Sequence, residues 1–264
     1  MWRLVLNAAE ARLDVLLGDA TGMRAAHCEH TPTRATEALA PALRELLRAQ
    51  GLAIPEVECI ACVAGPGSFT GIRLVLGTAV ALRRVAGHIR LAGLNFLQAV
   101  ACMAWRLDNA APPQVWALTH ARRGSVHLQG FAPTTNSPHT LAPLADMALC
   151  SLDAATARLR ACPSGTLLAG SGLARNPRLA EALPHCRLLD AVAARAPTQP
   201  EADDLWTLAA QATYACADIS PLYVRPCDAI DNLEQIANRR GLNPQAAQAT
   251  LAALLQAPVR DTSA

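Results

Sequence analysis

The amino-acid sequence predicts an α/β protein in which mixed sheets are flanked by helices. Short apolar stretches with a strand-like pattern alternate with longer stretches whose apolar residues recur at helical spacing. Two series of this kind each begin with a hairpin pattern, and a proline-containing stretch at 109–113 separates them. The chain has 264 residues and is 52% hydrophobic, which suffices for one large or two modest domains.

The first series covers about the first hundred residues. Pro41 either kinks the first expected helix or marks its true first turn. The alternation of Val57, Cys59, Ala61 and Val63 predicts a half-buried strand. In chain order we expect strands at 2–6 and 11–17 around a turn at 7–10, a helix at 35–50, a strand at 57–63, a helix at about 70–86, a strand at 91–94 and a helix at 97–106.

The second series begins after residue 113 with another hairpin. The segment 133–143 is rich in Thr, Ser, Asn and Pro and is interpreted as a loop. In order we expect strands at 115–119 and 125–131, a helix at 152–161, a strand at 166–169, a helix at 201–216 and a strand at 223–225.

The last segment, 231–256, contains two helix-like stretches around Gly241 and Pro244. We favour a helical hairpin on the body of the protein over a docking element for a partner. The predicted domains are therefore two lobes, 1–108 and 109–230, and a helical tail, 231–264.

The composition excludes several classes of function. All 23 basic residues of the Lys+Arg count are arginines, so a Walker-type phosphate lysine, a Schiff base and a Ser-Lys dyad are excluded. A net charge of +2 with scattered arginines does not predict strong nucleic-acid binding by the chain alone. The short apolar start at 1–7 is no secretory signal, so we expect a cytoplasmic protein without membrane spans.

The nine cysteines are dispersed and lie mostly in apolar contexts, as expected of small core residues. Cys59 and Cys62 form a CxxC pattern within an expected strand. Residues three apart in a strand point to opposite faces, so joint metal or redox chemistry is not expected.

The segment 65–73 has the sequence GPGSFTGIR and lies between an expected strand and an expected helix. Ser68 or Thr70 can cap this helix. A glycine-rich approach to a helix N-terminus suits either contact with a phosphate or close packing against another backbone. Arg73 lies in the first helical turn, where it can meet a bound anion or fix the loop by a salt bridge or carbonyl contact.

This nine-residue segment, followed by a small-residue helix, resembles the signature of the TsaB family. These are bacterial tRNA threonylcarbamoyladenosine biosynthesis proteins, formerly called YeaZ or glycoprotease-like M22 proteins. The resemblance extends more weakly over 34–50 and 91–101 and to the PLYVR sequence at 221–225.

The resemblance implies the two-lobed actin/hexokinase/Hsp70-like (ASKHA) fold. It also implies a non-catalytic scaffold that supports threonylcarbamoylation of N6 of the adenosine 3′ of the anticodon in ANN-decoding tRNAs. The partners implied are a TsaD-like catalytic subunit, a TsaE-like ATPase and tRNA through the complex, with a homodimer as an alternative use of the same surface. The two helices before and after the signature strand are the expected interface, unless both faces belong to the protein's own core; its candidate residues are Leu39, Leu43, Leu46, Val75, Thr78, Ala79 and Leu82.

The chain departs from the family at both hairpins. Asn7-Ala8-Ala9 stands where the family usually has Asp-Thr-Ser or Asp-Thr-Ala, and His120-Ala121-Arg122 stands where it typically has Asp-Ala-Arg. Without these carboxylates a magnesium ion has fewer oxygen ligands. We therefore expect no catalytic residue and no tightly bound cofactor, with ATP or ADP restricted to the level of the complex.

The sequence lacks the residues needed for a helical metal site and for a serine nucleophile. His27 and His30 do not have the i, i+4 spacing of a helical metal site, so no metal site is expected. Ser68 lacks the second glycine of a nucleophile elbow. The alternative function is a stand-alone nucleotide-binding enzyme, such as a small kinase, for which the phosphate-loop candidates are Gly65, Gly67, Ser68, Thr70, Gly71 and Arg73.

Overall fold

A computed structural model describes residues 1–30, 35–108, 110–122, 124–134, 137–189, 197–222 and 233–256. The chain divides into two compact units, Met1–Val224 and Arg225–Ala264. No helix of the described residues is long and apolar enough to cross a membrane.

The first sheet has the strand order β3-β2-β1-β4-β5. Its hairpin strands β1 (Trp2–Asn7) and β2 (Leu13–Asp19) pair antiparallel, and β1 pairs in parallel with β4 (Val57–Gly65), which pairs in parallel with β5 (Arg90–Asn95). The edge strand β3 (Gly22–Glu29) was not predicted. Its side chains are exposed or half-buried and include charged residues, so the sequence lacks an apolar strand pattern there.

Strand β4 is buried on both faces, so the prediction of a half-buried strand is wrong. A central parallel strand is covered by helices on each side, and from Cys59 onward its sequence is therefore continuously apolar and buried. The Cys62 thiol contacts the backbone of α2 (Phe69–Val85), with Sγ 3.5 Å from the Val75 oxygen. The Cys59 thiol lies near Arg90 and Met1 instead, so the two sulfurs of the CxxC pattern do not act together.

The second sheet has the order β11-β10-β6-β7-β8, with β9 also paired to β7. Its strands are β6 (Val115–Arg122), β7 (Ser125–Thr134), β8 (Ser137–Pro143), β9 (Ala148–Ser151), β10 (Leu167–Ala169) and β11 (Arg187–Leu188). The interpretation of 133–143 as a loop is wrong, because β8 pairs antiparallel with β7 over most of that segment. Backbone pairing at a sheet edge tolerates the Ser, Thr and Pro residues that suggested a loop.

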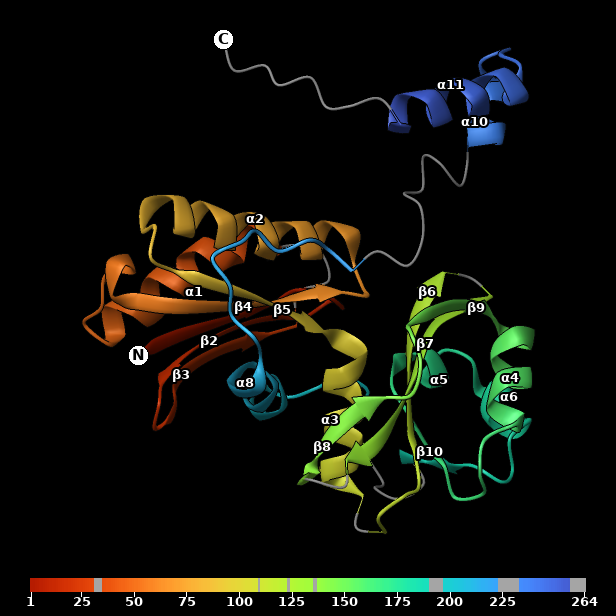
Figure 1. Cartoon of the computed structure of the whole chain (residues 1–264), viewed down its shortest axis with the longest axis horizontal. Coiled ribbons are helices and arrows are strands. Elements are labelled where there is room, and N and C mark those ends of the chain that lie inside the picture. The colour runs from red at the N-terminus through yellow and green to blue at the C-terminus, as the bar shows by residue number, and fades with distance from the viewer. Residues whose placement is uncertain are drawn as a thin grey trace. The chain divides into compact units, whose positions relative to one another are not determined.

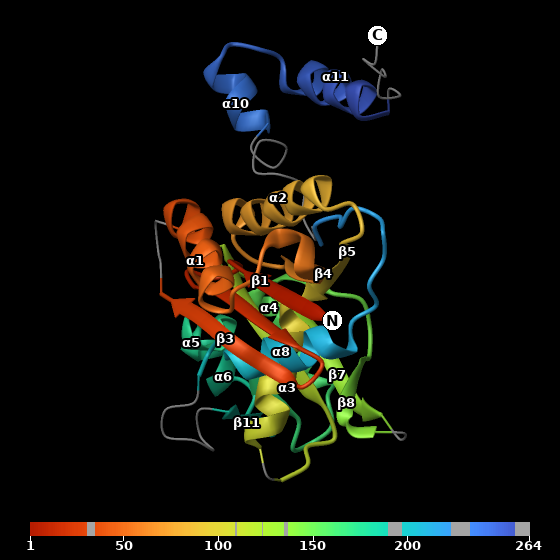
Figure 2. The same cartoon turned by 90° about the vertical axis from the view of Figure 1, so that its left-hand side faces the viewer.

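Helices flank both sheets (Figures 1 and 2), and the buried side chains between them form three apolar clusters. Helices α1 (Ala35–Ala49) and α2 cover one face of the first sheet, and α3 (Phe96–Leu107) with α8 (Ala202–Gln211) covers the other. Helix α3 also packs against β6, so one cluster joins both sheets. The far face of the second sheet packs against α4 (Leu152–Arg160), α5 (Ser171–Ala174) and α6 (Pro177–Glu181). Pro41 lies inside α1 and not in its first turn.

After α8 the chain returns to the first sheet. The backbones of Ala215 and Leu91 exchange two hydrogen bonds, and the Leu222 N–H donates to the Ala64 oxygen at 2.8 Å. The Arg83 side chain of α2 fixes this segment through Asp218 and the Cys216 carbonyl. The strand predicted at 223–225 lies outside the described residues.

The second unit contains α10 (Leu233–Arg239) and α11 (Pro244–Gln256), which pack on each other. Both fall within the stretches predicted as helical. Where this unit docks, and the domain boundaries at 108 and 230, stay predictions.

Candidate functional site

The signature segment leads directly from β4 into α2. Of the two candidate caps, Ser68 caps α2: its Oγ accepts a hydrogen bond from the Gly71 N–H at 3.2 Å. The Ser68 N–H itself donates to the Ala9 carbonyl at 2.5 Å. The loop is therefore tied to the hairpin between β1 and β2.

The glycines of the signature are required by this contact. A Cβ atom at Gly67 would overlap the backbone of Ala9, and one at Gly71 would overlap the Ala8 carbonyl oxygen. Gly67 also has φ +156° and Gly65 has φ +134°, within the range that favours glycine. Of the two alternatives for this loop, the structure shows close packing, and the partner backbone is the protein's own hairpin.

Arg73 and Phe69 form an exposed pair at the start of α2. The guanidinium carbon lies 3.8 Å from the centre of the Phe69 ring, within the range of a cation–π contact. Phe69 is 39% exposed, although most large apolar side chains of the first lobe are buried. The side chain of Thr70 is also exposed.

The hairpin that receives the loop is organised around a buried carboxylate that the sequence reasoning missed. Asp14 is fully buried; it accepts hydrogen bonds from Asn7 Nδ2 at 2.8 Å and from Arg12 Nε at 2.7 Å. Asn7 Oδ1 accepts the Ala9 N–H at 3.0 Å, which fixes the turn. The available signal was a single acidic residue within the apolar run LDVLL.

A second polar cluster joins the two lobes at this hairpin. The Ser171 hydroxyl donates to Glu10 Oε1 at 2.6 Å and accepts the backbone N–H of His120 at 3.1 Å. Burial raises the pKa of Glu10, while Ser171, Arg175 and Gln199 partly offset this by favouring the ionised form. Burial also lowers the pKa of His120, and the nearby positive charge of Arg175 adds to this effect.

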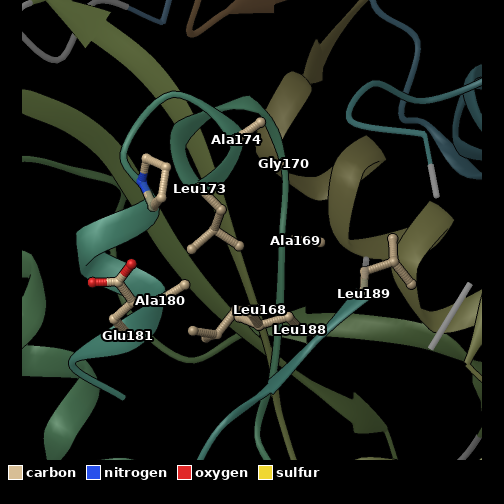
Figure 3. A pocket seen from close by; sticks show the side chains of 10 residues that line it. Leu168, Ala169, Gly170, Leu173, Ala174, Ala180, Glu181, Leu188 and Leu189 are labelled. Carbon is tan, nitrogen blue, oxygen red and sulfur yellow. The ribbon is translucent and has the colours of Figure 1, made fainter. Parts of the chain in front are cut away.

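A cavity of about 350 Å³ opens beside the start of α5, between β10, α6 and β11 (Figure 3). Leucine side chains face it, and Glu181 is the one ionisable residue among the described residues of its lining. Such a lining suits an apolar group better than a phosphate.

Another cavity, of about 540 Å³, lies between α3 and α8. Its two buried carboxylates are already paired. Asp204 accepts two hydrogen bonds from Arg106 at 2.8 and 3.1 Å, and Asp108 accepts two from Arg187 at 2.7 and 3.0 Å. Because Asp204 and Asp108 are both held in ion pairs with arginines, we interpret their charges as structural and not as a ligand site.

The interface candidates occupy a groove and the core beneath it. Leu39, Leu43, Leu46, Val75 and Ala79 are buried, whereas Thr78 and Leu82 are half-buried. A groove of about 350 Å³ between α1 and α2 is lined by Leu39, Leu43, Thr78 and Leu82, and also by Thr36, Ala40, Arg44, Leu47, Ile54 and Leu74. Four of the seven candidates therefore line a surface groove, and the other three belong to its supporting core.

Potential metal ligands are not clustered: within the described ranges, no three His, Cys, Asp or Glu side chains are placed to hold a metal ion. His27 instead contacts Glu29 on the same strand at 3.3 Å. The absence of a metal or a cofactor stays a prediction.

The two helix-flanked sheets, with a shared helix between them, define an actin/hexokinase/Hsp70-like fold. Solved structures agree: an uncharacterized Pseudomonas aeruginosa protein similar to the peptidase YEAZ superposes with a TM-score of 0.67 at 23% identity, covering 85% of this chain and 99% of that one. YeaZ from the same organism gives a TM-score of 0.66 at 23% identity, covering 84% and 99%.

Sequence comparisons agree with the signature. A family model described as TsaD, tRNA N6-adenosine threonylcarbamoyltransferase, matches residues 29–158. The tRNA threonylcarbamoyladenosine biosynthesis protein TsaB of Escherichia coli (strain K12) is 32% identical over 102 residues, which are 39% of this chain and 43% of the relative's length. The chain is thus similar to TsaB (YeaZ) proteins in sequence over part of its length and in fold over most of it.

Proposed function

We propose that this protein is a non-catalytic activator subunit of the complex that adds a threonylcarbamoyl group to tRNA. The observation that carries the proposal is the apolar groove between α1 and α2. A groove lined mainly by leucines lets a helix of a partner bury apolar side chains and gain dispersion contacts. The matches to TsaB and to the TsaD family model support the choice of pathway and of partner.

The chemistry would belong to the partner. A TsaD-like subunit would transfer the group from threonylcarbamoyl-AMP, made by a TsaC-like enzyme, to N6 of the adenosine beside the anticodon. This chain would bind the competent conformation of that subunit better than other conformations and so raise its population. A TsaE-like ATPase would act in the same complex, and tRNA would be bound through the complex.

We propose further that the chain binds no nucleotide tightly by itself. At the first hairpin the amide of Asn7 is committed to Asp14 and to the turn. The ionised Glu10 would place a negative charge where the two lobes meet, which disfavours a phosphate there. ATP or ADP would then bind at the level of the complex.

Co-purification with the TsaD-like protein of the same organism tests the docking surface. Ala40→Arg places a long charged side chain in the groove from an exposed position on α1. Ala49→Arg is the matched control: it is also exposed on α1 but lies nine residues, about two and a half turns, further along and faces away. We expect Ala40→Arg to abolish co-purification and Ala49→Arg to preserve it.

The reverse result, or equal retention of both variants, would overturn the proposed surface. Ala79→Arg is unsuitable because Ala79 is fully buried, so the substitution would damage the core. In a transfer assay the isolated chain should be inactive and should stimulate the TsaD-like subunit. Transfer by the purified chain alone would contradict the non-catalytic role.

A second copy of this chain is the competing partner for the same groove, and its binding there would form a homodimer. Sedimentation of the wild type and of Ala40→Arg distinguishes the two cases: a dimer lost in the variant shows that the groove is shared by self-association.

The alternative function is a stand-alone nucleotide-binding enzyme, for which the apolar cavity beside α5 would suit the base of a nucleotide but not its phosphates. Calorimetry with Mg-ATP decides between the two functions. Micromolar binding by the isolated chain would support the enzyme, and millimolar or no binding would support the activator. Gly67→Val is no test of the loop, because any Cβ atom at position 67 displaces the hairpin.

A further inference from the structure

The turn between β1 and β2 carries a carboxylate into the second lobe. Glu10 lies on this turn, and its Oε1 accepts a hydrogen bond from the hydroxyl of Ser171, which is 161 residues away in sequence. The same hydroxyl accepts the His120 N–H at the end of β6, so both its proton and its lone pair are used. The contact therefore links the hairpins of both sheets through one side chain.

Both partners of this contact are held by their own lobes. Gly170 has φ +111°, and a Cβ atom there would overlap the Leu118 oxygen. A Cβ atom at Gly172 would lie 2.9 Å from the Leu118 Cβ. The backbone on each side of Ser171 is thus pressed against β6, which fixes its hydroxyl, as Asn7 fixes the turn that carries Glu10.

A carboxylate buried at a contact between lobes is costly unless the surroundings favour its charge. Arg175 and Gln199 supply part of that compensation, in addition to Ser171. All three belong to the second lobe or to the segment that follows it. The first lobe contributes the anion, and the rest of the chain contributes the groups that hold it.

We infer that Glu10 is an internal ligand of the second lobe, whose carboxylate bonds to Ser171 and holds the two lobes together without a bound small molecule. The contact acts in addition to the packing of α3 against both sheets. It gives the protein one fixed arrangement of its hairpins in the absence of nucleotide. This inference does not depend on the proposed partner or on the groove between α1 and α2.

Amide hydrogen exchange tests the inference. We compare the wild type with Glu10→Ala, Ser171→Ala, the double variant and Glu10→Gln, and for each substitution we measure exchange in the lobe that does not carry it. Glu10→Ala should speed exchange of the His120 amide, and Ser171→Ala should speed exchange of the Ala9 amide. We expect an increase of about tenfold or more in each case, as for a lost hydrogen bond to a charged group. At the Ala9 amide the double variant should not exceed Glu10→Ala. At the His120 amide it should not exceed Ser171→Ala, which also removes the acceptor of that N–H.

Two controls separate the contact between lobes from a general loss of stability. Glu10→Gln keeps an oxygen that accepts from Ser171 and should stay close to wild type. Ser151→Ala removes a hydroxyl that caps α4 inside the second lobe, through the Ala154 N–H, and should leave exchange at Ala9 unchanged.

Effects confined to the lobe that carries each substitution, or additive effects in the double variant, would overturn the inference. If Glu10→Ala changes the melting temperature in either direction, the exchange pattern still decides, because it reports on the opposite lobe.

Discussion

Replacing Asn7 by Asp restores the residue type usual in the family, and the structure predicts that it damages the protein. Asn7 Nδ2 donates to Asp14 Oδ2 at 2.8 Å, and Asp14 is fully buried. In the variant two carboxylate oxygens would meet at this distance. Their repulsion is about 6 kcal/mol at an effective dielectric constant of about 20.

The Asn7→Asp variant would avoid this repulsion by keeping one of the two carboxyl groups protonated. For an aspartate with an ordinary pKa of about 3.9, holding the proton at pH 7 costs about 4 kcal/mol, and at pH 5 about 1.5 kcal/mol. The protonated group can donate to Asp14 as the amide did, so protonation is the cheaper state. Because the pKa is raised in the folded state, the variant loses stability as pH rises above about 4.

Urea unfolding at pH 5, 6 and 7 measures this trend. Asn243→Asp is the control, since an exposed aspartate at that position can accept the Gln245 N–H as the asparagine does. Calorimetry with Mg-ATP on the same samples tests the alternative that an aspartate at position 7 serves nucleotide binding. A variant as stable as wild type at pH 7 that gains nucleotide binding would refute the structural role of Asn7.

Three further predictions concern local packing and charge. Gly71→Ala should lower the free energy of unfolding by about 2 kcal/mol, since its Cβ meets the Ala8 backbone, whereas Gly77→Ala, with open space, should be neutral or stabilising in the same urea titration. Burial raises the pKa of Glu10 above 4.5, so stability should fall as pH rises through that raised value and the buried group ionises, although the carboxylate still accepts from Ser171; Glu10→Gln should flatten this part of a melting-temperature profile against pH. Asp204→Ala should cost about 2 kcal/mol by removing its hydrogen bonds from Arg106 and from the Glu201 N–H at the start of α8, whereas the exposed neighbour Asp203→Ala should change stability by under about 0.5 kcal/mol in thermal unfolding.

The helices of the first lobe were predictable because each has one strong apolar face. Leu39, Leu43 and Leu46 recur at helical spacing and are buried against the sheet. Local residue type limited the cap of α2 to Ser68 or Thr70, and the structure selects Ser68. These features depend on contacts close in sequence or on a single periodic face.

The edge strands were not predictable in the same way. Strand β3 has no buried residue and contains charged side chains, and β8 carries Ser, Thr and Pro, so neither has an apolar pattern. Both are strands because a neighbouring strand supplies backbone partners. That information is in the tertiary arrangement and not in the composition of the segment.

The polar cluster between the lobes was missed for a related reason. Glu10 and Ser171 are unremarkable residues of a turn and of a short helix, and only the fold brings them to 2.6 Å. The glycines at 170 and 172 were a usable signal, because such spacing marks a close backbone approach. The signature glycines have the same role at the first hairpin.

The two hairpin positions that depart from the family pattern therefore have structural roles of their own. At the first hairpin, the Asn7 amide organises the turn that receives the signature loop. At the second, position 120 contributes its backbone N–H to Ser171, and a backbone donor is available whatever the side chain. An activator that presents a groove needs its supporting loop and hairpins held in one arrangement, and it does not need a metal-binding carboxylate. The residues found at these positions meet the first requirement, which is the one that the proposed function imposes.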